Sequence, residues 1–151
     1  MALLDAIGTT IRQIKRYLKD KKSHRAIFVI ITDGYENASR KYEYEDIEEM
    51  IEHSKKHYDW EFMFLGANID AAREAQRFGI DHSRAVRYCH DARGTALNYE
   101  VFNEALMDFR SAKPLSDSWK EKIEKDYQKR SKRTRKLHFP RSGIPRGNTV
   151  L

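Results

Sequence analysis

The chain has 151 residues, a net charge of +6 and a single cysteine, Cys89. This is the length of one ordinary domain with a real core, a lone cysteine cannot form an internal disulfide, and no apolar run approaches the roughly 18 residues of a membrane span. The amphipathic N-terminus also lacks the apolar core of a signal peptide. We therefore expect a cytoplasmic protein that does not enter a membrane.

The first half of the chain alternates between helical and strand patterns. Apolar residues recur at helical spacing from the first residues to about Asp20 and predict an amphipathic helix. The next apolar run, AIFVIIT at 26–32, has no polar alternation, which is typical of a strand covered on both faces. A helix is predicted over 44–58, where acids come early and lysines late, as the helix dipole favours. Another covered strand follows at 60–67.

The second half continues this alternation. A short helix at 69–79 is closed by Gly79 as its C-cap, and 83–90 is predicted as a short, half-buried edge strand. A helix over 95–112 follows, with Thr95 as its N-cap. Helices that alternate with strands in this way predict an α/β fold, in which right-handed crossovers place helices on both faces of a parallel sheet.

The distribution of charge divides the chain in two. Residues 1–112 carry 17 Lys and Arg against 19 Asp and Glu, whereas residues 113–151 carry 12 against 4. We therefore predict an α/β domain over 1–112 and a basic tail over 113–151, helical at first and irregular at its Pro- and Gly-containing end. Within this tail, Leu115, Trp119 and Ile123 recur at helical spacing and predict a narrow stripe that packs on the domain.

The tail contains a run of positive charge without an acid. Its basic members are Lys129, Arg130, Lys132, Arg133, Arg135 and Lys136. Such a run can bind phosphates through salt-dependent contacts, but it lacks the interleaved aromatic residues that stack on bases. A solvated basic surface is the alternative. A nucleic-acid-associated accessory protein that binds through this tail is therefore our second functional hypothesis.

The apolar run at 26–32 stops at Asp33 and Gly34. Ligands of parallel sheets bind beyond the carboxyl ends of the strands, so Asp33 is either a functional carboxylate or part of an ordinary Asp-Gly turn. Cys89 and His90 do not suggest a catalytic pair, because neighbours on a strand point to opposite faces. We expect no enzymatic activity. An enzyme that uses Asp33 as general base or metal ligand remains a third hypothesis.

Three stretches, taken in order, resemble the von Willebrand factor type A (vWA) family. FVIITDGYEN at 28–37 is similar to a strand and loop in which that family has Thr-Asp-Gly. ALLDAI at 2–7 is similar to the helix before that strand, and FMFLGANIDA at 62–71 to the next strand and loop. The resemblance covers residues 1 to about 110 and implies a truncated Rossmann-like sheet, because the family's first three strands have no counterpart here.

The resemblance implies a metal-ion-dependent adhesion site, in which three loops hold one divalent cation and Asp33 is the carboxylate of the third loop. Four polar residues would support the site only from outside the ligand sphere: Thr32, Glu36, Asn37 and Ser39. The first loop, Asp-x-Ser-x-Ser, has no counterpart, and Met1 holds the place of the second loop's threonine. A thioether is a poor ligand for Mg²⁺, so we expect a degenerate site without a tightly bound Mg²⁺ or Mn²⁺.

In the family's sheet, the strand at 26–32 lies beside the first, central strand, so the truncation would uncover its edge. Long apolar edges are aggregation hazards. A twofold dimer through this edge, completion by another polypeptide, or a start codon placed too late in a longer gene would each explain it, and we expect the dimer for a free, ordered chain. The expected function is a protein-interaction module, with a protein partner that the sequence does not name.

Overall fold

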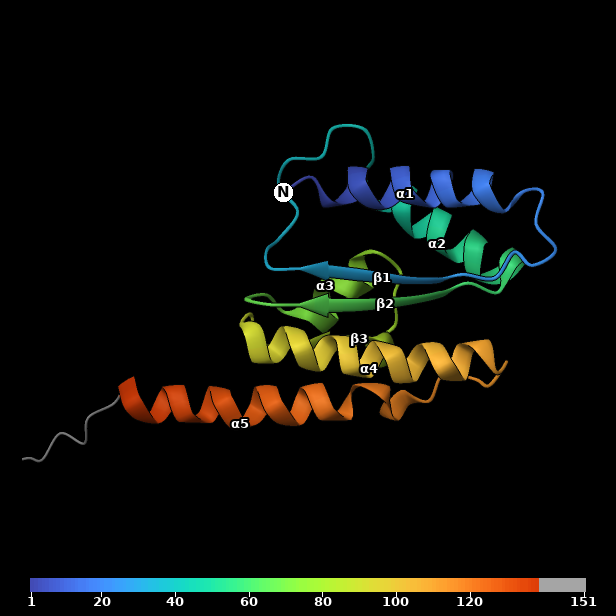
Figure 1. Cartoon of the computed structure of the whole chain (residues 1–151). Coiled ribbons are helices and arrows are strands. Elements are labelled where there is room, and N and C mark those ends of the chain that lie inside the picture. The colour runs from blue at the N-terminus through green and yellow to red at the C-terminus, as the bar shows by residue number, and fades with distance from the viewer. Residues whose placement is uncertain (139–151) are drawn as a thin grey trace, which may run out of the picture.

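The computed structural model describes residues 1–138, and Figure 1 shows helices on both sides of a small sheet. The elements in chain order are α1 (Leu3–Leu18), β1 (Ile27–Thr32), α2 (Tyr44–Tyr58), β2 (Glu61–Gly66), α3 (Ala71–Arg77), η1 (His82–Arg84), β3 (Ala85–Arg87), α4 (Ala92–Arg110), η2 (Asp117–Lys120) and α5 (Glu121–His138). The predicted α/β class, a small Rossmann-like parallel sheet between helices, is therefore confirmed.

The sheet is parallel and its strands lie in the order β1-β2-β3. Ile27 of β1 pairs with Glu61 of β2, and the pairing continues to Thr32 and Gly66. β3 adds only a short pairing at the carboxyl half of β2. Because each strand is added on the same side of the previous one, right-handed crossovers place both connecting helices, α2 and α3, on one face.

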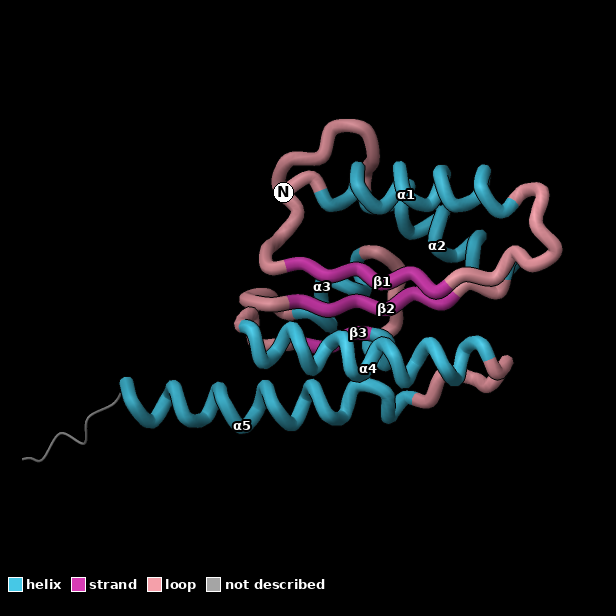
Figure 2. Tube along the Cα trace, viewed as in Figure 1, coloured by secondary structure: helices cyan, strands magenta, loops and turns pink. Residues whose placement is uncertain are grey.

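Two buried clusters fill the two faces of the sheet. The first lies beneath α1, α2 and α3 and includes Phe28, Ile30 and Phe62. The second lies beneath α4 and α5 and includes Met63 and Leu65. β2 is therefore buried on both faces, as its unbroken apolar run predicted. Figure 2 shows the strands between the two layers of helices.

The long helices bury one stripe and expose the rest. In α1 the buried residues follow helical spacing: Leu3, Leu4, Ile7, Gly8 and Ile11. Arg12 and Arg16 lie on the exposed side of the same helix. Among residues 1–138, none of the helices combines the length and the apolar character that crossing a bilayer requires.

The residues after α4 add to the buried cluster that covers the second face of the sheet. Leu115, Trp119 and Ile123 are buried in the cluster beneath α4 and α5. The indole N–H of Trp119 donates a hydrogen bond to the carbonyl oxygen of Ser83 (2.8 Å). The prediction that this stripe packs on the domain is therefore confirmed. The end of the predicted tail, residues 139–151, lies outside the described residues.

Two predicted boundaries are wrong. α4 begins at Ala92 rather than near Thr95, because Asp91 is its N-cap and its carboxylate accepts a backbone hydrogen bond in the first turn. The strand predicted over 83–90 shrinks to β3, because His82–Arg84 form a turn of 3-10 helix before it. In both places an aspartate, Asp91 or Asp81, is the N-cap that sets where the helical segment begins. Hydrophobic periodicity does not reveal N-caps, so the prediction missed these boundaries.

Candidate functional site

The predicted site residues lie at the carboxyl end of the sheet. Thr32 ends β1 and is buried, whereas the Asp33 side chain is 51% exposed. The loops after β2 and β3 end at the same edge because the strands are parallel. His90 Nδ1 lies 3.6 Å from a carboxylate oxygen of Asp33, and the hydroxyl of Tyr35 accepts a hydrogen bond from Asp70 N (3.1 Å). The fold thus joins three loops at this edge.

Glu36 organises the loop that follows β1. Its carboxylate accepts hydrogen bonds from the backbone N–H groups of Leu4 (2.8 Å), Ala38 (2.9 Å) and Ser39 (2.7 Å), and from the Ser39 hydroxyl (2.8 Å). Burial by itself would raise the pKa of this carboxyl, but the hydrogen bonds outweigh burial and lower the pKa to about 2. Glu36 is therefore a charged acceptor that ties the loop to α1.

Asp5 fastens the other end of the same loop to α1. Its carboxylate accepts hydrogen bonds from the backbone N–H groups of Arg40 (3.0 Å), Lys41 (2.9 Å) and Tyr42 (3.1 Å). The bond from Arg40 is the main cause that lowers the pKa of Asp5. We did not predict a site role for Asp5, because its partners are more than thirty residues away and no local pattern connects them.

The surroundings of Asp33 fit a hard cation poorly. The Thr32 hydroxyl donates to the carbonyl oxygen of Gly34 (2.8 Å) and lies 3.1 Å from the sulfur of Met1. The side-chain oxygen of Asn37 accepts a hydrogen bond from the Met1 amino group. Mg²⁺ needs oxygen ligands in octahedral geometry, and this arrangement offers a thioether instead. Within residues 1–138, no group of three or more His, Cys, Asp or Glu side chains is placed to hold a metal ion.

Burial raises the pKa of both side chains that precede His90. Burial raises the pKa of the Cys89 thiol, so the nucleophilic thiolate is disfavoured. Burial, with a smaller contribution from the charge of Asp33, raises the pKa of Tyr88. The contact between His90 and Asp33 is half exposed on both sides, and exposed ion pairs of this kind contribute little free energy.

Arg130 joins α5 to the beginning of α4. Its Nε donates to a carboxylate oxygen of Asp126 (3.0 Å), and its guanidinium also contacts Asp91. The Asp126 side chain is only 8% exposed, so this ion pair is largely removed from solvent. The hydrogen bond to Asp126 is the main cause that raises the pKa of Arg130. One of the six predicted phosphate-binding residues therefore serves an internal contact.

The other predicted phosphate-binding residues lie on the surface of α5. These exposed side chains are Lys129, Lys132, Arg133, Arg135 and Lys136. Figure 1 shows the last turns of α5 projecting past the beginning of α4, on the side toward which β1 and β2 point. The exposed basic residues are thus available to an acidic partner without any rearrangement of the fold.

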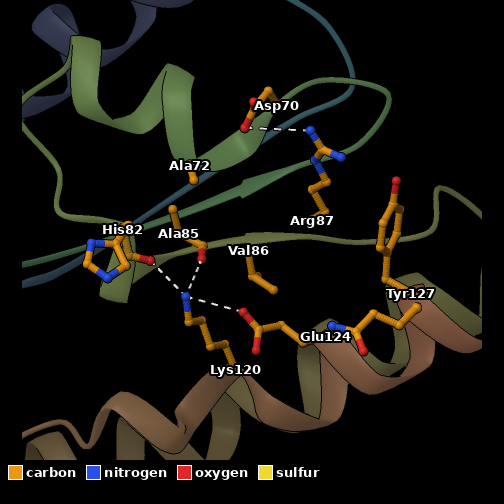
Figure 3. Close-up of a pocket in the computed structure, with 10 residues that line it drawn as sticks. Asp70, Ala72, His82, Ala85, Val86, Arg87, Lys120, Glu124 and Tyr127 are labelled. Carbon is orange, nitrogen blue, oxygen red and sulfur yellow. Dashed lines mark hydrogen bonds and ion pairs between the residues drawn. The ribbon is translucent and has the colours of Figure 1, made fainter.

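A separate pocket of about 330 Å³ runs along the free edge of β3, between α3 and α5 (Figure 3). Lys120 reaches across it from η2. The Lys120 ammonium donates hydrogen bonds to the carbonyl oxygens of His82 (2.7 Å) and Ala85 (3.0 Å) and lies 3.3 Å from the carboxylate of Glu124. Lys120 thus occupies the carbonyl oxygen of Ala85, a backbone acceptor at the free edge of β3 that an added strand would use, which protects this edge from pairing.

Only Asp33 and its neighbours in sequence could be predicted as parts of this site; the other residues come from distant segments that the fold brings to it. Asp33 was found because it ends an apolar strand, whereas Asp5 and His90 reach the site from distant segments. Comparisons with protein-family models, with curated proteins and with solved structures find no match for this chain. The resemblance to the vWA family therefore rests on the sequence motifs alone and stays a prediction.

Proposed function

We propose that this chain is a protein-interaction module of the vWA type, with a degenerate metal site at Asp33. The observation that carries the proposal is that two carboxylates fasten the loop of residues 33–43 to α1. Glu36 of the loop accepts a hydrogen bond from Leu4 N of α1, and Asp5 of α1 accepts one from Lys41 N of the loop. The loop presents Asp33 and Tyr35, whose side chains are about half exposed. Preorganised surfaces bind with a smaller ordering cost, and tyrosine is enriched in interfaces.

The contacts around Asp33 support an interaction that does not depend on a divalent cation. The oxygen atoms of Glu36 accept hydrogen bonds from the loop itself, and the Thr32 hydroxyl donates to Gly34. A bound Mg²⁺ requires about six oxygen ligands, so Asp33 alone would leave most positions to water. We propose that Asp33 and Tyr35 contact the partner protein directly.

We further propose that the module is not an enzyme and works in the cytoplasm. The raised pKa of the Cys89 thiol, which burial causes, argues against a nucleophilic cysteine. The pocket along β3 is lined by residues of α3, β3 and α5 and does not include Asp33. A single cysteine is also what a reducing compartment favours.

Metal titration tests the degenerate site. We expect isothermal titration calorimetry with MgCl₂ and MnCl₂ to give no saturable binding to the wild-type chain, and Asp33→Ala to behave identically. A saturable heat in the wild type that disappears in Asp33→Ala would overturn this part of the proposal.

Photo-crosslinking tests the recognition surface. A photoreactive amino acid at position 35 should capture a protein partner in cells, and the same amino acid at Tyr17, which is exposed at the far end of α1, is the matched control. Capture at position 35 that Asp33→Ala reduces and that is not seen at position 17 is the expected result. Equal products at both positions would contradict a specific surface around Asp33.

The second candidate function is nucleic-acid binding through the exposed basic residues of α5. The observation that favours it is their position on a helix end that projects from the body of the protein (Figure 1). We expect fluorescence anisotropy with a labelled oligonucleotide to show an affinity that falls steeply between about 50 and 200 mM salt. Replacing Lys132, Arg133, Arg135 and Lys136 with alanine should abolish it, and unchanged binding would exclude this candidate.

For the partner, we propose that the chain also associates with a second copy of itself through β1. In the described residues, β1 pairs with β2 on one edge only, and Ile31 on this strand is 47% exposed. Pairing with another strand would satisfy the backbone of that edge and cover its side chains.

A further inference from the structure

The backbone of β1 shows which residues an added strand would meet. The carbonyl oxygens of Ala26 and Thr32 accept hydrogen bonds from backbone N–H groups at the two ends of the β2 ladder (3.0 and 2.9 Å). Backbone groups alternate in direction along a strand. The even-numbered residues therefore face β2, whereas Ile27, Val29 and Ile31 direct their N–H and C=O groups to the free edge.

The side chains of these three residues are incompletely covered. Ile31 is 47% exposed, and Ile27 and Val29 are only partly buried at the margin of the cluster beneath α4 and α5. Phe102 of α4 is also only partly buried there, and Tyr99, one turn before it, is 62% exposed. The free edge of β1 and the flank of α4 thus leave several apolar side chains incompletely covered in the described part of the chain.

Opposite charges flank this strand symmetrically. Arg25 precedes Val29 by four residues, and Asp33 follows it by four. Within the chain, the Nε of Arg25 lies 3.0 Å from the carboxylate of Asp59, and the Arg25 guanidinium lies over the ring of Phe109, near the end of α4. Asp33 contacts His90, just before α4 begins. Both charges therefore lie on the face of the sheet that α4 covers, at opposite ends of the strand.

We infer that β1 pairs antiparallel with β1 of a second copy, around a twofold axis at Val29. This register places Ile27 opposite Ile31 of the second copy and Val29 opposite itself, and each pair can exchange both backbone hydrogen bonds. It also places Arg25 opposite Asp33 in both halves of the interface. The two sheets then form one continuous sheet.

The alternative registers lose this complementarity. A shift by two residues in one direction brings Arg25 opposite Ile31, and a shift in the other brings Asp33 opposite Ile27. A shift by one residue would place Ile27, Val29 and Ile31 opposite even-numbered residues of the second copy, whose backbone groups already form hydrogen bonds with β2. A foreign strand would have to match the same apolar and charged positions, whereas a second copy matches them by symmetry.

This inference deepens the self-association proposed above and does not depend on the role of the loop at Asp33. Cysteine cross-linking of the full chain tests it in a Cys89→Ser background. Hydrogen-bonded residues of antiparallel strands have Cα atoms about 5.5 Å apart, which is within the range of a disulfide. Val29→Cys should therefore form a covalent dimer under mild oxidation.

The neighbouring positions test the register itself. Ile27→Cys alone and Ile31→Cys alone should not cross-link, whereas an equimolar mixture of the two variants should form a mixed disulfide. Tyr17→Cys, exposed on α1, is the control for collisional cross-linking, and circular dichroism verifies that each variant is folded.

Native mass spectrometry of the wild-type chain separates the possible failures. A dimer together with the expected cross-links supports the inference. A dimer in which Val29→Cys does not cross-link, or in which Ile27→Cys cross-links alone, would overturn the register but leave self-association standing. A monomer at concentrations up to about 100 μM, where even a weak dimer would be populated, would overturn both.

Discussion

The two edges of the sheet are built in opposite ways. β3 has three residues, and Lys120 caps the carbonyl oxygens beside it. β1 has six residues, of which Ile31 is 47% exposed and Ile27 and Val29 are only partly buried. Short strands and lysines are devices by which proteins block unwanted strand pairing. The chain thus closes the β3 edge with its own η2 and α5, whereas in the described residues the free edge of β1 has no strand paired with it.

The largest expected effect comes from opening the closed edge. Trp119 is 9% exposed and holds η2 against η1, the turn just before β3, through its hydrogen bond to the carbonyl oxygen of Ser83. Trp119→Ala should lower the free energy of unfolding by about 3–5 kcal/mol, because it leaves a large cavity. Trp119→Phe, which keeps most of the apolar volume, should cost less. Urea denaturation measures both, and a loss below about 1 kcal/mol for Trp119→Ala would mean that this anchor does not hold the edge.

The next effect comes from blocking the open edge. Val29→Lys would place two like charges opposite each other at the proposed twofold axis, which is unfavourable between paired strands. We expect the dimer dissociation constant to rise by about a hundredfold or more, equivalent to at least about 2.7 kcal/mol, as measured by sedimentation equilibrium. Val29→Thr is the uncharged control and should retain the dimer. A Val29→Lys chain that dimerises like the wild type would show that β1 is not the interface.

A smaller loss of stability is expected from a change in the loop of residues 33–43, which belongs to neither edge of the sheet. The pKa of Glu36 is lowered from 4.5 to about 2 in the folded chain, so its ionised form favours folding. Its contribution to stability is complete above about pH 4.5 and is lost as the pH falls toward 2. Glu36→Gln should therefore lower the free energy of unfolding at pH 7 by about 1–2 kcal/mol.

The pH dependence separates Glu36 from ordinary surface carboxyls. Urea denaturation at pH 7, 4.5 and 3 should show the difference between wild type and Glu36→Gln shrinking toward the lowest pH. Glu52→Gln, a change at an exposed residue of α2, is the matched control and should change stability little at any of these values. A constant difference between wild type and Glu36→Gln would contradict the assigned role.

The smallest effect on stability is expected at Lys120. Lys120→Met keeps the length of the side chain but removes the hydrogen bonds to His82 and Ala85, so we expect a loss of about 1 kcal/mol. The same change frees the carbonyl oxygen of Ala85 at the edge of β3, and light scattering should detect more concentration-dependent association than in wild type. Lys125→Met, at an exposed position of α5, should not associate more. If both variants behave alike, Lys120 does not guard the edge.

Part of the candidate site was predictable because its signal is local. Asp33 interrupts a strand pattern, and the end of a strand in a parallel sheet is where ligands bind. The sequence also suggested Glu36 as a supporting residue. It did not predict that Glu36 binds Leu4 and Ser39, because no local pattern connects Glu36 to α1. The same is true of Arg130, whose basic neighbours suggested phosphate binding before the fold placed it against Asp126.

From the sequence we could predict the order of helices and strands, the burial of β2 and the packing stripe at Leu115, Trp119 and Ile123. These follow from apolar periodicity, which records which face of each element meets the core. Three features became visible only in the folded chain: Lys120 closes one edge of the sheet, the side chains of Ile27, Val29 and Ile31 are incompletely covered at the other edge, and Asp5 and Glu36 hold the loop at Asp33. No sequence pattern reports these features, because they depend on hydrogen bonds and contacts between segments that meet only after the chain has folded.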